Sequence, residues 1–167
     1  EFAARPGVFS IIKTNTPLQY DVPMTLGVME MARHGQPTLI TPFIIAGAST
    51  PNSLASAMAM NSAEVLFGVV LAQLVRPGAP VFYGCAAMPV DMKTGAPAYG
   101  WADMNRFTLL GAQMARRYKL PMRTSNFSSE NVPDFLSGMQ ATFMSYSALT
   151  SGAHLLMHAT GWAEGGL

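Results

Sequence analysis

The feature that most constrains the fold is a regular alternation of short apolar segments with longer segments of helical character. The first of them, at residues 9–12, is β-branched and ends in a polar turn at residues 13–17, which is typical of a buried strand and its exit loop. We expect strands at residues 9–12, 38–41, 80–83, 121–124 and 154–157. Helices are expected between them, at residues 24–34, 50–75, 103–118 and 131–151. Apolar strands joined by helices predict a parallel sheet covered by helices.

Local signals set the expected helix starts and the loops between the elements. Thr50 is the expected N-cap of the second helix, Asp103 or a neighbour caps the third, and Asn131 opens the fourth. Residues 42–49 are expected to be a loop, although an unusually apolar one. Residues 84–100 form a second expected loop that is rich in Gly and Pro, and loops this long are often functional.

The predicted fold class is α/β, a sector of about five βα units of a (β/α)₈ barrel. A complete barrel needs about 250 residues, so residues 1–167 are expected to be a single domain that is part of a larger chain. Charged residues make up only 11% of the chain, against about 25% in typical soluble domains. This composition predicts apolar faces that would meet further strands and helices. An open, doubly wound sheet is the alternative, but polar edge strands are not evident.

Composition also bears on partners and location. Segment 54–75 contains Asn61, Glu64 and Gln73, and segment 135–163 is broken by polar residues, so neither is typical of a membrane span. A net charge of +1 gives no reason to expect a nucleic-acid or membrane partner. The single cysteine, Cys85, and the lack of a visible signal peptide favour a reducing compartment, so we expect a cytoplasmic protein.

Chemistry in either parallel architecture is expected at the carboxyl ends of the strands. The side chains that follow the predicted strands are aromatic, amide or basic: Phe43, Tyr83, Arg123, Asn126, Phe127, His158 and Trp162. Each has an alternative interpretation. The aromatic side chains could belong to the core, and residues 14–16 read as ordinary turn chemistry. Cys85 is expected to be a small buried hydrophobe, His154 a hydrogen-bonded core residue, and His158 either functional or structural.

No motif for metal, nucleotide or nucleophile chemistry stands out. His154 and His158 would lie about 13 Å apart on a strand, too far for one zinc ion, so no metal site is predicted. The sequence has no G-x-S-x-G, and no strand is followed by G-x-G-x-x-G. From composition and spacing alone the chain is a parallel α/β sector with aromatic and amide groups at its strand exits.

Motifs along most of the chain, from about Ile12 onward, resemble the trimethylamine methyltransferase family in order and spacing. They lie at residues 46–51, 63–64, 71–84, 91–97, 115–121, 125–126 and 155–167. The resemblance implies a longer chain that forms one (β/α)₈ barrel. It also implies transfer of a methyl group from a methylated amine to the Co(I) of a partner corrinoid protein, as in methanogenesis. The corrinoid would then be carried by that partner, with no cofactor bound directly.

One departure from the family narrows the implied substrate. Aligning on Gly161, Trp162 and Glu164 places the family's pyrrolysine at or next to Thr160, and no unusual residue stands there. A tertiary amine would have to leave as an amide anion, so it needs electrophilic activation, whereas a quaternary ammonium leaves as a neutral amine. The chain is therefore similar to members without pyrrolysine, such as glycine betaine methyltransferases.

The resemblance also suggests roles for the strand-exit residues. Thr160 and His158 become the candidate catalytic positions. A quaternary ammonium favours aromatic faces, which Phe43, Tyr83, Phe127 and Trp162 would supply. A betaine carboxylate would need a donor from Arg123, Asn126 or His158, and Glu164 or Asp91 would favour the cation through its field. No general base is needed, because no proton moves.

Two alternative functions stay open at this point. One is a relative of the same fold that binds quaternary amines without transferring methyl groups. The other is an unrelated parallel α/β enzyme, such as a hydrolase or aldolase. The expected partners are a cognate corrinoid protein and a small methylated amine, and a homo-oligomer is open. A chain of only this length is expected to be inactive alone.

Overall fold

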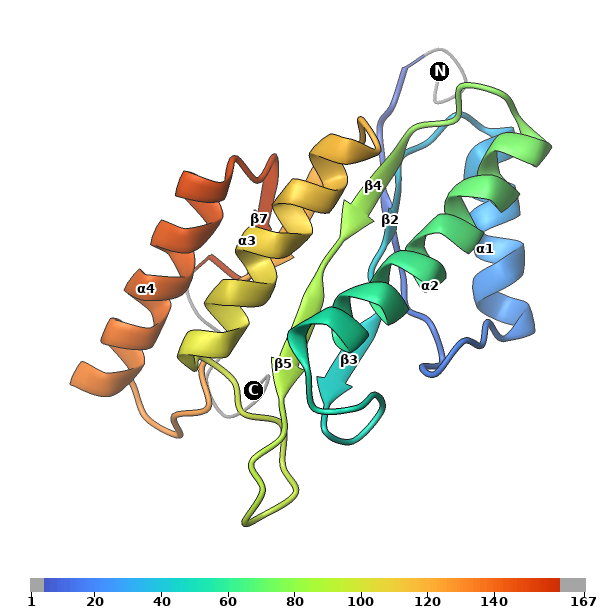
Figure 1. The fold of residues 1–167 in the computed structure, drawn as a ribbon. Coiled ribbons are helices and arrows are strands. Elements are labelled where there is room, and N and C mark those ends of the chain that lie inside the picture. The colour runs from blue at the N-terminus through green and yellow to red at the C-terminus, as the bar shows by residue number, and fades with distance from the viewer. Residues whose placement is uncertain (1–4, 160–167) are drawn as a thin grey trace.

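The computed structural model describes residues 5–159. This part of the chain contains seven strands and four helices, with one or two strands before each helix and a last strand after α4 (Figure 1). The strands are β1 (Ser10–Ile12), β2 (Thr38–Ile40), β3 (Phe43–Ala46), β4 (Val81–Gly84), β5 (Ala86–Pro89), β6 (Met122–Ser125) and β7 (Leu155–Met157). The helices are α1 (Val22–Arg33), α2 (Leu54–Val75), α3 (Ala102–Arg117) and α4 (Phe135–Ser151).

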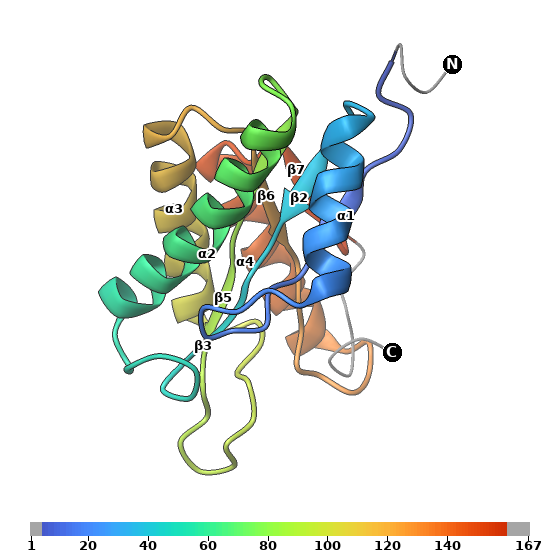
Figure 2. The same ribbon diagram turned by 90° about the vertical axis from the view of Figure 1, so that its right-hand side faces the viewer.

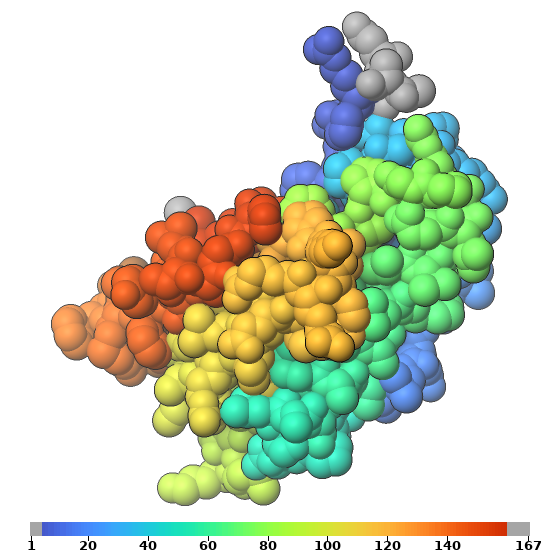
Figure 3. Space-filling view, turned by 45° about the horizontal axis from the view of Figure 1, so that its top comes forward, coloured from blue at the N-terminus to red at the C-terminus, as the bar shows by residue number. Residues whose placement is uncertain are grey.

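The main sheet has five parallel strands in the order β1-β2-β4-β6-β7, which is their order in the chain. Because crossovers between parallel strands are right-handed, this order places the helices on one face of the sheet. The sheet curls away from these helices into a half-barrel (Figures 1 and 2). In the space-filling view, α1 to α4 follow one another across the outer side (Figure 3). The predicted fold class, a sector of a (β/α)₈ barrel, is confirmed.

Two segments expected to be loops contain strands. β3 and β5 pair in parallel as a second, two-stranded sheet, with Phe43 opposite Ala86. β3 begins shortly after β2 ends, and β5 begins shortly after β4 ends. The small sheet therefore extends the course of β2 and β4 beyond the main sheet. The alternating burial of β3 shows why the apolar segment is a strand: one side chain in two is buried and the next is only partly so.

The predicted helix starts are wrong by a few residues. Ser53 caps α2 by accepting a hydrogen bond from the Ser56 N–H, whereas Thr50 is buried in the turn after β3 and bridges to Ala46. Trp101 precedes α3, and no side chain caps that helix. Asp103 lies within the first turn, where a carboxylate complements the helix dipole. Asp134, rather than Asn131, caps α4.

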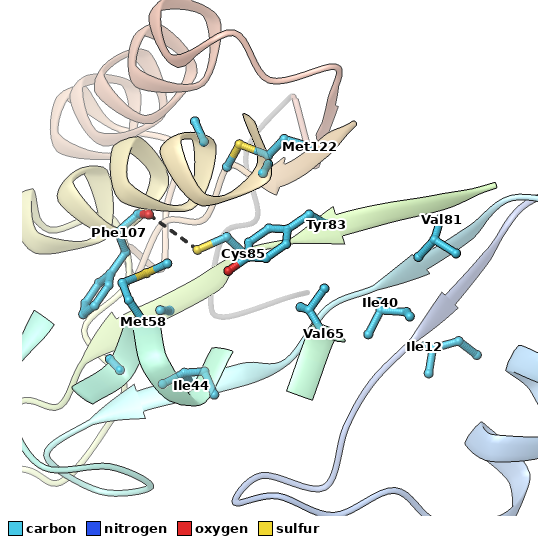
Figure 4. Close-up of a cluster of buried hydrophobic side chains, with 14 of the residues drawn as sticks. Ile12, Ile40, Ile44, Met58, Val65, Val81, Tyr83, Cys85, Phe107 and Met122 are labelled. Carbon is cyan, nitrogen blue, oxygen red and sulfur yellow. Dashed lines mark hydrogen bonds between the residues drawn. The ribbon is translucent and has the colours of Figure 1, made fainter. Parts of the chain in front are cut away.

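The core lies between the sheet and the helices. Ile12, Ile40, Tyr83 and Met122 share one register row and point toward the helices (Figure 4). Side chains alternate along a strand, so the residues next to these four point to the concave side of the half-barrel. Gly84 is required where β4 meets β2, because a Cβ there would lie 2.3 Å from the Ile40 carbonyl oxygen.

The outer surface agrees with the low charge content. Large apolar side chains of α4 are exposed, among them Phe135, Tyr146 and Leu149. A broad hollow of about 830 Å³ runs along this face of α4, away from the concave side of the sheet. Within residues 5–159, α2 alone is long and apolar enough to cross a membrane by length and composition, a test that core helices also pass. Its buried Asn61 and Glu64 contact protein groups.

Candidate functional site

A cavity of about 340 Å³ opens on the concave side, at the carboxyl ends of the main strands. Its lining comes from four separate stretches of the chain and consists of Ile11, Lys13, Phe43, Arg123, Phe127 and His158. Ile11 and Arg123 stand next to Ile12 and Met122, which point toward the helices, so strand alternation turns both into the cavity. This is the end of a parallel barrel where ligands bind.

Arg123 is the most informative residue of the cavity. It is 1% exposed, yet it forms no ion pair within residues 5–159, where all ion pairs are short-range and lie on exposed helix faces. Its Nε donates to the Met157 sulfur at 3.2 Å, and its Nη1 has no hydrogen-bond partner among the described residues. Burial lowers the pKa of Arg123 to about 10, so the guanidinium is still charged at pH 7.

Two further basic groups face the same space. Burial, together with the charge of Arg123, lowers the pKa of Lys13 to about 8. The Lys13 ammonium lies 5.8 Å from the centre of the Phe43 ring. Burial and the nearby charges of Arg123 and Lys13 lower the pKa of His158, so its imidazole is neutral at pH 7. A cavity with a buried arginine, a half-buried lysine and no carboxylate in its described lining is suited to an anionic group.

Aromatic rings form the other part of the site. The Phe127 ring lies 5.1 Å from the His158 ring and 5.5 Å from that of Tyr99, which in turn lies 6.4 Å from Phe43. His158 has a left-handed backbone (φ +58°), a strained conformation for histidine that is enriched at functional sites. The rings provide the electron-rich faces that organic cations prefer.

The structure brings four of the predicted residues together: Phe43, Arg123, Phe127 and His158. Sequence reasoning missed Lys13 and Tyr99. Lys13 directly follows the first predicted strand, so its position at a strand exit was a usable signal. Tyr99 lies in the segment after β5, and no local pattern indicates that this segment folds back to Phe127.

Tyr83 is a correction, because it does not line the cavity. It points toward the helices and is 0% exposed, and its hydroxyl bonds to Ser62 Oγ at 2.8 Å and to Asn61 Nδ2 at 3.1 Å. Burial raises the pKa of Tyr83 to about 12. The position at a strand exit was right, but the register row shared with Ile40 sends this side chain to the other face.

Asn126 is a second correction. It is fully buried, and its Nδ2 donates to the Ala141 carbonyl and to Ser145 Oγ, both on α4. Asn126 therefore anchors α4 to the end of β6, whereas Arg123 and Phe127 face the cavity. Asp91 is also turned away: its carboxylate accepts hydrogen bonds within its own exposed turn, from the Lys93 N–H and the Thr94 hydroxyl.

The remaining expectations have mixed outcomes. Cys85 is a buried hydrophobe, as predicted, and burial raises the pKa of its thiol to about 12. His154 accepts a hydrogen bond from the Met122 N–H, but it is exposed rather than in the core. Thr160, Trp162 and Glu164 lie outside the described residues. Within residues 5–159, no three His, Cys, Asp or Glu side chains are grouped so that they could hold a metal ion.

The family model for trimethylamine methyltransferase matches residues 1–167, the whole chain. The chain belongs to the trimethylamine methyltransferase family. It is 33% identical to a glycine betaine methyltransferase of Desulfitobacterium hafniense over 158 residues, which are 94% of this chain and 33% of the relative. It is 32% identical to trimethylamine methyltransferase MttB of Methanosarcina barkeri, over 95% of this chain and 32% of that protein.

A proline betaine:corrinoid methyltransferase of Eubacterium limosum is 29% identical over 136 residues, 78% of this chain and 28% of the relative. The chain thus spans about a third of the length of these curated relatives. The two betaine enzymes and the trimethylamine enzyme differ in their named substrates, so family membership alone leaves the substrate of this chain undecided.

Proposed function

We propose that this protein is a methyltransferase that moves a methyl group from a methylated amine to the Co(I) of a corrinoid protein. The observation that carries the proposal is the cavity at the carboxyl ends of the strands, where aromatic rings stand beside the buried Arg123, whose Nη1 has no hydrogen-bond partner among residues 5–159. The names of the similar proteins support the same reaction. The corrinoid belongs to a separate partner protein and supplies the nucleophile that accepts the methyl group.

The preferred substrate in this proposal is a quaternary ammonium that also carries a carboxylate. The faces of Phe43 and Phe127 would contact the methylated ammonium. Arg123, with Lys13 beside it, would bind the carboxylate through charge-assisted hydrogen bonds. Trimethylamine carries no carboxylate and so offers no group to satisfy the Arg123 guanidinium, and it therefore fits this cavity less well.

Catalysis in this proposal depends on positioning the substrate and excluding water, and it uses no general acid or general base. A quaternary ammonium leaves as a neutral amine, so no residue has to move a proton. Arg123 and the aromatic rings would hold the substrate so that one methyl group faces the incoming nucleophile, and the apolar walls would exclude water. The neutral imidazole of His158 can hydrogen-bond the substrate without adding a third positive charge. Thr160, at the position of the family's pyrrolysine, stays a candidate catalytic residue in this proposal.

Partner and location follow from the same proposal. The partner is a cognate corrinoid protein that presents its cobalt to the open side of the cavity. A protein of this kind is expected in the cytoplasm, which also suits the buried, reduced thiol of Cys85.

Calorimetry with the intact protein tests the substrate class. Glycine betaine, proline betaine and carnitine are titrated in parallel with trimethylamine, and the proposal expects the carboxylate-bearing quaternary amines to bind more tightly. Methylation of cob(I)alamin in the presence of the bound amine then tests transfer. Binding without methylation would favour a binding relative, and no binding by any quaternary amine would overturn the proposal.

A further inference from the structure

Glu64 is a buried carboxylate that the cavity does not use. It lies on α2, is 2% exposed, and belongs to one of the motifs that carry the family resemblance. Its Oε2 accepts hydrogen bonds from the hydroxyls of Thr14 and Thr16, the latter at 2.8 Å. Its Oε1 accepts the backbone N–H of Leu18 at 2.8 Å. All three donors to the carboxylate belong to the loop that leaves β1.

A buried carboxylate is costly unless its oxygens are hydrogen-bonded or paired with a cation. Glu64 forms no ion pair within residues 5–159, so the loop donors alone satisfy its carboxylate. The Tyr20 hydroxyl also donates to the Glu64 backbone carbonyl at 2.7 Å, which ties the far end of the loop to the same turn of α2. A single helical residue thus holds both ends of residues 14–20.

The held loop is under strain and begins directly after a residue of the cavity. Leu18 has a left-handed backbone (φ +56°), which is unfavourable for a leucine, and its N–H is one of the groups bound by Glu64. Lys13 immediately precedes Thr14. The Lys13 ammonium has no hydrogen bond or ion pair within the described residues, and Arg123 repels it, so the Phe43 ring at 5.8 Å is its one attractive contact there and the loop must help to hold it over the cavity.

We infer that Glu64 is a positioning residue, which keeps the ammonium of Lys13 over the cavity by anchoring residues 14–18 to α2. Without this anchor the strained loop would relax, and Lys13 would turn from Arg123 toward water. The effect of Glu64 on substrate binding and methyl transfer rests on the proposed function. Its effect on the position of Lys13 does not.

The chain's lysines allow a direct test on the intact protein. This chain has three of them, Lys13, Lys93 and Lys119, and the last two are exposed. Reductive methylation with ¹³C-formaldehyde gives each lysine an NMR signal, which single Lys→Arg variants assign. A pH titration then reports the environment of Lys13, with Lys93 and Lys119 as internal controls.

Glu64→Gln keeps the shape of the side chain and removes its charge. We expect the pKa of Lys13 to rise from about 8 toward the 10.5 of a free lysine, while Lys93 and Lys119 stay unchanged. Glu30→Gln is the matched control, because Glu30 is an exposed glutamate whose carboxylate pairs with Arg33 and His34, and it should leave Lys13 unchanged. Thr16→Val removes one of the three donors and should produce a smaller shift in the same direction.

A double-mutant cycle separates positioning from a general loss of stability. If Glu64 acts through Lys13, Lys13→Met weakens betaine binding in the wild type but has little further effect in Glu64→Gln. An unchanged Lys13 signal in folded Glu64→Gln, or in Thr16→Val if Glu64→Gln does not fold, would overturn the inference. If no quaternary amine binds the wild type, the proposed function fails, and the NMR titration still decides the role of Glu64.

Discussion

Tyr83 and Arg123 lie near the ends of neighbouring strands, and both are buried, but they point to opposite faces of the sheet and differ in their hydrogen-bond partners. Tyr83 points toward the helices, and its hydroxyl has two protein partners, Ser62 and Asn61. Arg123 points to the concave side, where one of its nitrogens has no partner in the described part of the chain. The difference indicates which buried polar group serves the fold and which is available to a ligand.

The energetic argument behind this comparison is simple. Leaving a buried polar group unpaired costs about 1–3 kcal/mol, and more for a charged group. A buried guanidinium with no carboxylate partner in the described part of the chain therefore carries a cost that a bound anion would offset. The polar group of Tyr83 carries no such cost, since its partners are in place. The predictions below test this contrast between Arg123 and Tyr83.

Arg123→Met gives the largest expected effect, and it falls on binding. Loss of the guanidinium should weaken glycine betaine binding by about 3 kcal/mol, roughly a hundredfold in Kd, because the carboxylate loses its charged partner. Stability should stay the same or rise, because a buried charge that forms no ion pair within residues 5–159 is removed. Calorimetry and urea unfolding measure the two effects. Arg106→Met, at an exposed arginine of α3 paired with Asp103, should change neither.

Tyr83→Phe should show the reverse pattern. The hydroxyl is lost, so Ser62 and Asn61 each lose a partner in the core, and the free energy of unfolding should fall by about 1–2 kcal/mol. Betaine affinity should stay within about twofold, since the side chain faces the helices. Urea unfolding followed by circular dichroism gives the stability. A large loss of affinity with unchanged stability would place Tyr83 back in the site.

The pH dependence of binding tests Lys13, the second cation of the cavity. Its pKa is about 8 in the fold and 10.5 in a free lysine, so a carboxylate ligand should bind less tightly as the pH rises above about 8. Between pH 8 and 10.5 the unfolded state binds more protons, so this group should make stability rise with pH over that window. Lys13→Met should remove both trends. An affinity that does not change between pH 7 and 9.5 would contradict this role.

The smallest expected effect concerns Cys85, whose reactivity toward a thiol reagent should not change when betaine binds. Its thiol is buried on the helix side with Tyr83, and its pKa is raised to about 12, so a thiol reagent should react with it only when the protein unfolds. The slow rate in the folded protein should be the same with betaine present and in Arg123→Met. If betaine slowed the modification of Cys85, the ligand would have to reach the side of the sheet that faces the helices, which would contradict the proposed site.

Much of this fold could be predicted from the sequence, because the strands of the main sheet are apolar runs separated by helices with clear ends. β3 and β5 could not, since their pairing is a contact between distant segments and the Gly- and Pro-rich segment 84–100 reads as a loop. The helix starts were misplaced where a capping residue such as Thr50 instead closes a turn.

The site was predictable only in part, for a similar reason. Position at a strand exit indicated Arg123, Phe127 and His158, but it does not specify the face of the sheet, so Tyr83 and Asn126 were assigned to the wrong side. Register decides the face, and register depends on neighbouring strands. Lys13 directly follows the first predicted strand, and the structure places it on the cavity, next to the loop whose hydroxyl and N–H groups bind Glu64.

A crystal structure of the intact protein with glycine betaine tests the central claim most directly. We predict the carboxylate at about 2.7–2.9 Å from the Arg123 guanidinium and the trimethylammonium group between the rings of Phe43 and Phe127. Betaine bound elsewhere, or a protein carboxylate paired with Arg123 in the occupied cavity, would contradict the account.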